Sequence, residues 1–336
     1  MDLGSTDTRG LDITFHAVEN GEGSTLSLRR TVHEAPAHGE GGAPRRPVLI
    51  VPGYGMNSFI FGFHPRGRSL EGHLAWRGFE VWSVDLRDQG RSSRAPRRPR
   101  ERYGLEALAL TDTAVAVERV RALTQTGEAK VDLVGASLGA AVVSMYVVGA
   151  GADRAGSLVS FGGPVRWERV HPLVRVAFRS PRLAGAVPFR GTRALAGVAF
   201  PLLVRAPWAL SIYMNTRSTE TARWREMIQT VEDPVPRINR EIAEWIRDRD
   251  LTVRGRNVSE GLRRVENPML AVVALQDGIV PAETARSAFH LSGSSDKALL
   301  EVGGADAPMA HADLFLSRQA EREVFEPLAA WLASRA

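Results

Sequence analysis

Three residues of this chain, Ser137, Asp277 and His311, have the types and the order that nucleophilic catalysis by serine requires. A serine hydroxyl is a weak nucleophile at its ordinary pKa, so it needs an imidazole to accept its proton and a carboxylate to fix the tautomer of that imidazole. Each of the three lies just beyond a run that predicts a core strand. Because the carboxyl ends of parallel strands meet at one edge of a sheet, we predict a Ser-His-Asp triad there.

The residues around Ser137 predict a sharp turn between a strand and a helix. Apolar residues at 131–134 are typical of a strand, and those at 140–148 favour a helix. Gly135 and Gly139 permit the close backbone approach that a serine raised on such a turn requires. The amide of Leu138 lies at the predicted helix N-terminus, where unpaired N–H groups and the helix dipole favour a developing oxyanion.

The sequence leaves alternatives open for the acid and the base. Asp306 or Asp313 could replace Asp277, which would then be only a turn residue. His290 is another candidate base, although it lies in a predicted helix away from any strand end. His64 could contact substrate, or it could only pack against the protein.

Apolar runs typical of strands buried in a parallel sheet recur along the chain, at 47–51, 79–84, 131–134, 157–161, 269–275 and 298–302. Two alternating runs, 11–18 and 24–31, flank a Gly-containing turn and predict an N-terminal hairpin. Helices are expected at 69–77, 111–124, 281–290 and 320–333. Thr111 is the expected N-cap of the helix at 111–124. The predicted fold class is α/β, with a mostly parallel central sheet flanked by helices.

The strand pattern stops after residue 164, where short helical stretches alternate with prolines. The clearest helix spans 236–249, with apolar residues on one face. We interpret this part as a helical cap inserted into the core, which divides the chain into 1–164, 165–265 and 266–336. Arg166 and Arg169 could hold a substrate carboxylate. The aromatic residues of the cap favour packing and an apolar pocket: Trp208, Tyr213, Trp224 and Trp245.

The composition excludes several classes of site. There is no cysteine, which removes disulfides, thiolate metal ligands and a cysteine nucleophile. The formal net charge is +5, and the positively charged side chains are almost all arginine, because Lys130 and Lys297 are the only lysines. We interpret the dense arginine cluster at 94–102 as a solvated loop rather than a nucleic-acid site.

No segment is long and apolar enough to span a membrane, and the polar N-terminus is not typical of a signal peptide. We expect a cytoplasmic protein of bacterial type.

The chain resembles an α/β-hydrolase from about Leu11 to its end. Three segments carry the resemblance. Residues 135–139 are similar to the nucleophile elbow of that superfamily, residues 276–281 to its acid turn, and residues 310–315 to its histidine loop. The resemblance implies that the backbone amides of Tyr54 and Leu138 form the oxyanion hole. It implies neither a metal nor an organic cofactor.

Within the superfamily, the segments 66–82 and 311–316 look most similar to acid-lipase-like enzymes and to polyhydroxyalkanoate synthase and depolymerase-like proteins. The synthases use a cysteine in the elbow where this chain has Ser137, so their polymerising activity is not carried over. Pro52 also departs from the His-Gly turn common in lipases.

The function expected is a serine carboxylic ester hydrolase of esterase or lipase type. It would act through an acyl-enzyme on an ester with an apolar acyl group. The substrate would be a small-molecule ester or a lipid-like ester. An acyltransferase that uses the same triad is one alternative, and a non-catalytic binding protein of the same fold is another. The sequence does not decide the acyl length, the alcohol portion or the oligomeric state.

Overall fold

Eight strands form one sheet in the computed structural model, which describes residues 6–34, 45–93, 103–186 and 190–335. The strands are β1 (Leu11–Glu19), β2 (Thr25–His33), β3 (Val48–Val51), β4 (Val81–Asp85), β5 (Val131–Ala136), β6 (Ala155–Phe161), β9 (Met269–Ala274) and β10 (Lys297–Val302). Their spatial order is β1-β2-β4-β3-β5-β6-β9-β10. The N-terminal hairpin pairs antiparallel and β2 runs antiparallel to β4, whereas the six strands from β4 to β10 are parallel. The predicted hairpin and all six predicted core strands are confirmed.

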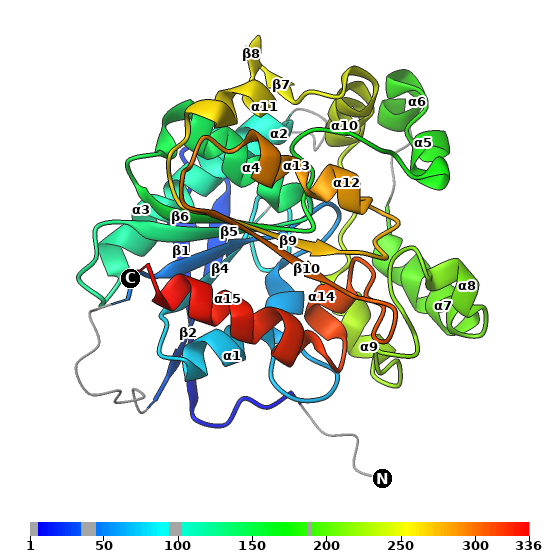
Figure 1. Ribbon diagram of the computed structural model, residues 1–336, viewed down its shortest axis with the longest axis horizontal. Coiled ribbons are helices and arrows are strands. Elements are labelled where there is room, and N and C mark those ends of the chain that lie inside the picture. Colours follow the sequence, from blue (N-terminus) through cyan, green and yellow to red (C-terminus); the bar gives the residue numbers. More distant parts are fainter. Residues whose placement is uncertain (1–5, 35–44, 94–102, 187–189, 336) are drawn as a thin grey trace.

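Both faces of the sheet are covered, because alternate side chains of each strand point to opposite sides. In β3, Leu49 and Val51 join one buried cluster, and Val48 and Ile50 join another. The first cluster lies under the helices α3 (Ala114–Leu123) and α4 (Leu138–Tyr146). The second lies under α1 (Leu70–Trp76) and α15 (Glu326–Ala333). Figure 1 shows α4 on one side of the sheet and α1 and α15 on the other.

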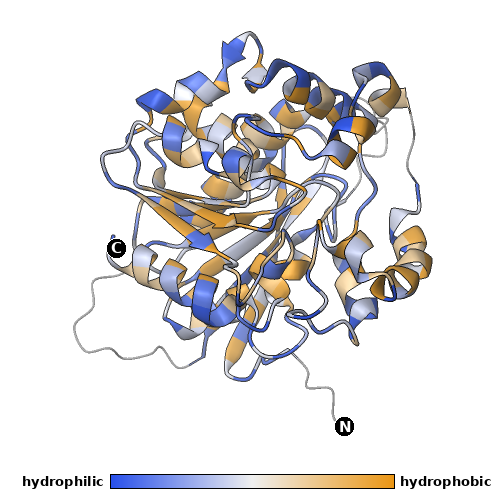
Figure 2. Ribbon diagram, turned by 45° about the vertical axis from the view of Figure 1, so that its right-hand side comes forward, coloured by the Kyte–Doolittle hydropathy of each residue, from blue (hydrophilic) through white to orange (hydrophobic). Residues whose placement is uncertain are grey.

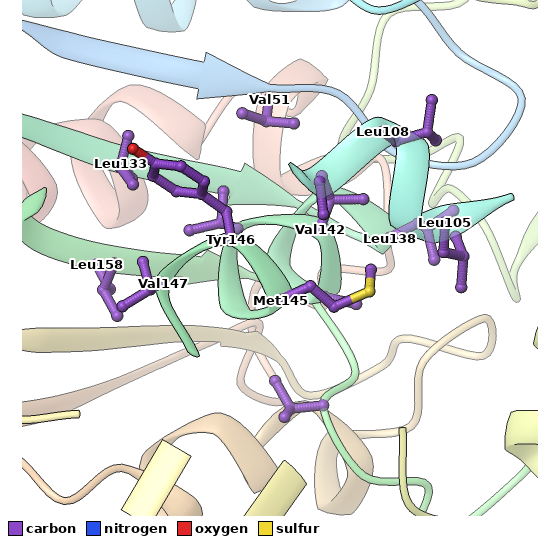
Figure 3. Close-up of a cluster of buried hydrophobic side chains, with 14 of the residues drawn as sticks. Val51, Leu105, Leu108, Leu133, Leu138, Val142, Met145, Tyr146, Val147 and Leu158 are labelled. Atoms are coloured by element: carbon purple, nitrogen blue, oxygen red, sulfur yellow. The ribbon is translucent and has the colours of Figure 1, made fainter. Parts of the chain in front are cut away.

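Helix α4 is held by apolar contacts along its whole length. Figure 3 shows Leu138, Val142 and Met145 of this helix in a cluster with Val51 and Leu133 of the sheet. All nine residues of α4 are buried. A helix packed in this way has one position relative to the sheet, so the turn that precedes it is also fixed in place.

The segment between β6 and β9, residues 165–265, is mostly helical and is called the inserted segment below. Helix α10 (Pro236–Asp248) matches the helix expected at 236–249, and Ile238, Ile242 and Trp245 are its buried apolar face. A short hairpin that the sequence did not predict follows it, with strands β7 (Thr252–Val253) and β8 (Arg256–Asn257). The other helices are α5 (Pro172–Ala177), α6 (Pro181–Ala186), α7 (Thr192–Val204), α8 (Pro207–Leu210), α9 (Trp224–Met227) and α11 (Val258–Gly261).

The prediction of Thr111 as an N-cap is wrong. The helical stretch begins earlier, with α2 (Leu105–Ala107) and a π-helical turn (Leu108–Thr113) that leads into α3. Gly104 precedes it with no capping side chain of its own, and the carboxylate of Glu241 in α10 accepts the Leu105 amide at 2.6 Å. The cap therefore comes from a residue distant in sequence, which a local pattern cannot reveal.

Two other predicted helices differ in detail. The helix expected at 281–290 is divided at Arg286 into α12 (Ala282–Ala285) and α13 (Ser287–Leu291). The helix expected at 320–333 begins with a π-helical turn before α15. The arginine cluster at 94–102 lies outside the described residues. No helix within the described ranges is long and apolar enough to cross a membrane.

Candidate active site

Ser137 stands on a strained turn between β5 and α4. Its backbone has φ 53° and ψ −122°, a left-handed φ that non-glycine residues rarely adopt. The flanking glycines allow this turn to lie close to its surroundings. A Cβ on Gly135 would lie 2.5 Å from the Cα of Ala140, and a Cβ on Gly139 would collide with the carbonyl oxygen of Val51. The predicted elbow is therefore present, and both glycines are required by close backbone contacts.

His311 and Asp277 form a direct hydrogen bond. His311 Nδ1 lies 2.5 Å from Asp277 Oδ2, and the two side chains are 12% and 1% exposed. The other carboxylate oxygen, Oδ1, accepts the amides of Ile279 at 2.8 Å and Val280 at 2.9 Å. A carboxylate held on both oxygens fixes a proton on Nδ1 of the histidine and leaves Nε2 able to accept one.

The end of β6 brings Ser137 beside this pair. The Ser137 amide donates to the carbonyl of Phe161 at 2.8 Å. The next residue, Gly162, has φ 52°, and a Cβ on it would lie 3.5 Å from Asp277 Oδ2 and 3.6 Å from His311 Nδ1. Within the part of the chain that the structure describes, no hydrogen bond joins the Ser137 hydroxyl to His311. Catalytic hydrogen bonds of free enzymes are often long and tighten only when substrate binds.

The loop after β3 packs against the elbow, as an oxyanion loop would. A Cβ on Gly53 would lie 2.9 Å from both the Ala136 carbonyl oxygen and the Ser137 Cβ. Tyr54 is anchored by its phenol, which donates to Asn239 Oδ1 in α10 at 2.6 Å, and burial raises the pKa of this phenol. Among the described residues, the backbone amides of Tyr54 and Leu138 donate to no acceptor. Unpaired backbone amides beside a serine hydroxyl are donors that an oxyanion could use.

His64 has a structural role. Its Nδ1 accepts the amide of Arg66 at 3.0 Å, so Nε2 carries the proton and donates to the carbonyl of Ser317 at 3.1 Å. Burial lowers the pKa of His64, which keeps the ring neutral. Because both ring nitrogens bind the backbone and the side chain is buried, the structure favours packing over the substrate contact that the sequence left open.

The alternative acid and base lie elsewhere or serve other contacts. Asp313 is fully buried and accepts the Thr219 hydroxyl at 2.6 Å and two backbone amides at 2.8 Å. Burial raises the pKa of Asp313 to about 6. Asp306 is exposed in a loop, and His290 is exposed on α13. Arg166 is paired with Asp250 and Glu260, so it is not available to a substrate carboxylate.

Two residues of the inserted segment hold the acid turn and the histidine loop: Ile212, which the sequence did not single out, and Tyr213, which it assigned only to packing around the pocket. The carbonyl of Ile212 accepts the Gly278 amide at 2.9 Å, and that of Tyr213 accepts the Ala312 amide at 2.8 Å. The Tyr213 ring also lies 6.2 Å from the His311 ring. These contacts use backbone groups that every residue carries, so no residue type could have pointed to them.

A second part of the inserted segment holds the loop after β3. Glu232 donates its amide to the Gly55 carbonyl at 2.7 Å, and Asn57 donates its amide to the Thr230 carbonyl at 2.9 Å. The Asn57 side chain also donates to the Glu232 carboxylate at 2.7 Å. The inserted segment therefore positions both sides of the site.

Two of the cavities formed by the described residues border the site. One of about 20 Å³ lies between the loop after β3 and α10, with Tyr54 and Leu138 in its lining. It is large enough for about one water molecule. An open cavity of about 740 Å³ lies beside the acid turn and is lined by Asp277, Gly278 and Trp208 among others. Ser137 and His311 are not in its lining. The described residues contain no group of three or more His, Asp or Glu side chains that could hold a metal ion.

Comparison with known proteins decides the family. The model of the alpha/beta hydrolase family matches residues 48–324, well over half of the 336-residue chain. The chain belongs to the alpha/beta hydrolase family. The matched range of this alpha/beta hydrolase includes Ser137, Asp277 and His311. No curated protein matches the chain. The predicted superfamily is confirmed, whereas the finer resemblance to acid lipases and polyhydroxyalkanoate synthases stays a prediction.

Solved structures share the fold of this alpha/beta hydrolase at low sequence identity. An enol-lactonase from Burkholderia xenovorans LB400 is 15% identical with a TM-score of 0.61, covering 95% of this chain and 99% of that chain. An esterase from Thermogutta terrifontis is 18% identical with a TM-score of 0.59, covering 96% and 99%. A meta-cleavage product hydrolase from Pseudomonas fluorescens IP01 is 13% identical with a TM-score of 0.60, covering 96% and 98%. The predicted fold class is thereby confirmed.

Proposed function

We propose that this alpha/beta hydrolase is a serine carboxylic ester hydrolase with Ser137, His311 and Asp277 as its triad. The observation that carries the proposal is the bond of 2.5 Å between His311 and Asp277 at the sheet edge where Ser137 stands on a strained elbow. Backbone strain of this kind persists only where surrounding contacts impose it, and it is common at catalytic positions. Membership of a hydrolase family supports the same reaction class.

In the proposed mechanism, His311 Nε2 takes the proton of the Ser137 hydroxyl as its oxygen attacks the ester carbonyl carbon. The amides of Tyr54 and Leu138 bind the oxyanion of the tetrahedral intermediate. His311 then gives its proton to the leaving alcohol, and the acyl group stays on Ser137. Water, deprotonated by His311, attacks the acyl-enzyme; the bond between the acyl carbon and the Ser137 oxygen then breaks, His311 returns the proton to Ser137, and the acid is released. Asp277 stabilises the imidazolium in each half of the reaction.

We further propose that residues 165–265 act as a cap over this site and favour an apolar acyl group. The Tyr213 ring beside His311 and the backbone contacts of the inserted segment to both site loops support this role. The length of the acyl chain can be determined with a series of p-nitrophenyl esters.

The test is labelling of the purified protein with a fluorophosphonate, followed by peptide mass spectrometry to locate the adduct. We expect an adduct on Ser137 that is lost in His311→Ala. Ser137→Ala should lower ester hydrolysis by on the order of 10⁴-fold or more, whereas Ser144→Ala in α4 is a matched control that should stay active. Ester turnover by Ser137→Ala within tenfold of wild type would contradict the assignment.

The same experiment separates the alternatives. A folded wild-type protein that takes up no label and binds an apolar ester without turnover would be a binding protein. Product analysis with added alcohols distinguishes hydrolysis from acyl transfer, because a transferase would form the new ester in place of the free acid.

A further inference from the structure

Four helices of the inserted segment carry large apolar side chains on their outer side. The exposed residues are Leu173 and Val176 of α5, Leu183 of α6, Leu195, Val198 and Leu202 of α7, and Trp208 of α8. We call this set the α5–α8 surface. Its members are between 56% and 79% exposed. Most large apolar side chains of the described protein are buried, so a concentration of this kind marks an interaction site.

Helix α7 shows most clearly that this surface lacks a partner. Its inner residues Phe200, Leu203 and Val204 pack against the core, while Leu195 and Leu202 form part of an exposed stripe on the outer side. A helix that is apolar on all sides is ordinarily buried on all sides. In this protein the outer side of α7 is covered by no described residue.

The segment that carries these helices has charged residues of one sign. Between residues 169 and 219 the chain has eight arginines and no aspartate or glutamate. Arg175, Arg179, Arg182 and Arg205 are exposed, and none of these four has an acidic partner among the described residues. Arginines elsewhere are commonly paired, as Arg237 is with Glu241. The α5–α8 surface therefore combines apolar side chains with cations that are not neutralised.

The four helices lie on the same side of the molecule, away from the sheet. Figure 1 places α5 and α6 above α7 and α8 at the right-hand edge, and Figure 2 turns this side forward and shows hydrophobic segments on the helices there. Pro172 at the start of α5 and Trp208 in α8 line the same open cavity. The two pairs of helices therefore flank this cavity and can meet one partner together.

We propose that the α5–α8 surface docks on an anionic lipid bilayer. Leucine, valine and tryptophan side chains would enter the boundary between headgroups and acyl chains, and the arginines would contact anionic headgroups while their aliphatic stems stay in the apolar region. This proposal does not depend on ester hydrolysis, because it concerns only where the protein binds.

Two other partners fit the surface less well. A nucleic acid would neutralise the arginines but would leave the apolar stripe of α7 without a contact. A second copy of the chain would cover the stripe, but a symmetric dimer through this surface would bring Arg175, Arg179 and Arg205 of one copy toward those of the other, and the segment 169–219 carries no acidic residue to separate them. A bilayer with anionic lipids supplies both missing contacts.

The test is co-sedimentation of the full-length Ser137→Ala protein with vesicles of phosphatidylcholine alone and with vesicles that also contain phosphatidylglycerol. Using the inactive variant keeps lipid hydrolysis out of the measurement, so failure of binding and failure of catalysis are separate results. We expect binding only to the vesicles with phosphatidylglycerol, and weaker binding at high salt. Circular dichroism of each variant confirms that it is folded.

Two variants test the contributions of charge and of apolar contact. Arg175→Gln with Arg179→Gln should weaken binding roughly 25-fold, about fivefold for each charge, whereas the exposed pair Arg256→Gln with Arg264→Gln removes the same charge elsewhere and should change it little. Val198→Asp should weaken binding about tenfold or more, whereas Ile13→Asp, at an exposed position of β1, should not.

Three results would overturn the proposal. The first is absence of binding to both kinds of vesicle. The second is equal weakening by the test and control pairs, which would indicate attraction by net charge alone. The third is a dimer in solution that Val198→Asp dissociates, which would assign the surface to a second copy.

Discussion

Replacing Asp277 with asparagine should abolish most activity without unfolding the protein, because the geometry forces the new side chain into one orientation. Asp277 Oδ1 accepts two backbone amides, those of Ile279 and Val280. An asparagine must place its only carbonyl oxygen there, so its NH₂ group faces His311 Nδ1. That nitrogen must then accept a hydrogen bond, and the proton moves to Nε2. A histidine in this tautomer cannot take the Ser137 proton.

The size of the effect follows from the contacts. Turning the asparagine over would lose both hydrogen bonds to the turn, about 1 to 3 kcal/mol together, so roughly a tenth or less of the molecules would hold the productive tautomer. The imidazolium would also lose its carboxylate partner. Together these losses should lower kcat/KM on the order of 10⁴-fold. Because asparagine has almost the same shape as aspartate, the midpoint of unfolding should change little.

The assay is hydrolysis of a short p-nitrophenyl ester by Asp277→Asn, with urea unfolding measured on the same sample. Asp313→Asn is the matched control, because Asp313 is a buried aspartate in the histidine loop that binds Thr219 and backbone amides rather than His311. The control should keep activity within about tenfold. A folded Asp277→Asn protein with activity within tenfold of wild type would refute the reasoning, and a collapse of activity in the control alone would move the acid to Asp313.

Three further predictions concern stability. Ser137→Gly should relieve the left-handed strain and raise the free energy of unfolding by up to about 2 kcal/mol while activity is lost. The control Ser144→Gly in α4 should lower the free energy of unfolding. If urea unfolding shows lower stability for both variants, strain is not stored at the elbow. Burial raises the pKa of Asp313 to about 6 from 3.8, so the folded state binds the carboxyl proton of Asp313 more tightly than the unfolded state does. Protonated Asp313 therefore stabilises the wild-type protein below about pH 4, and this stabilisation is lost as the pH rises to about 6. Asp313→Asn removes that dependence, so its stability relative to wild type should rise by up to about 3 kcal/mol across this window; a constant difference in urea unfolding would contradict this. Gly163→Ala should cost about 1 to 3 kcal/mol, because its Cβ would collide with α4 and lie 2.8 Å from the elbow carbonyl, whereas Gly304→Ala meets nothing within 4 Å and should be neutral in thermal unfolding.

Much of the fold could be predicted because its signals are local. A strand buried on both faces is a continuous apolar run, and the turn at Ser137 is marked by glycines on either side. The partnership of Asp277 and His311 could also be predicted, because parallel strands deliver their loops to one edge. The start of the helix near Thr111 could not be predicted, because Glu241 supplies its first contact from a distant helix.

The sequence by itself determined which chemical groups this protein has and along which edge of the sheet they lie. Only the tertiary structure decided how those groups are held. It showed that His64 binds backbone on both ring nitrogens, that Ile212 and Tyr213 hold the acid turn and the histidine loop, and that none of the described residues covers the outer side of α7. The physical reason is the same in each case. Backbone amides and carbonyls occur at every residue, and an apolar residue has the same identity whether or not another segment covers it.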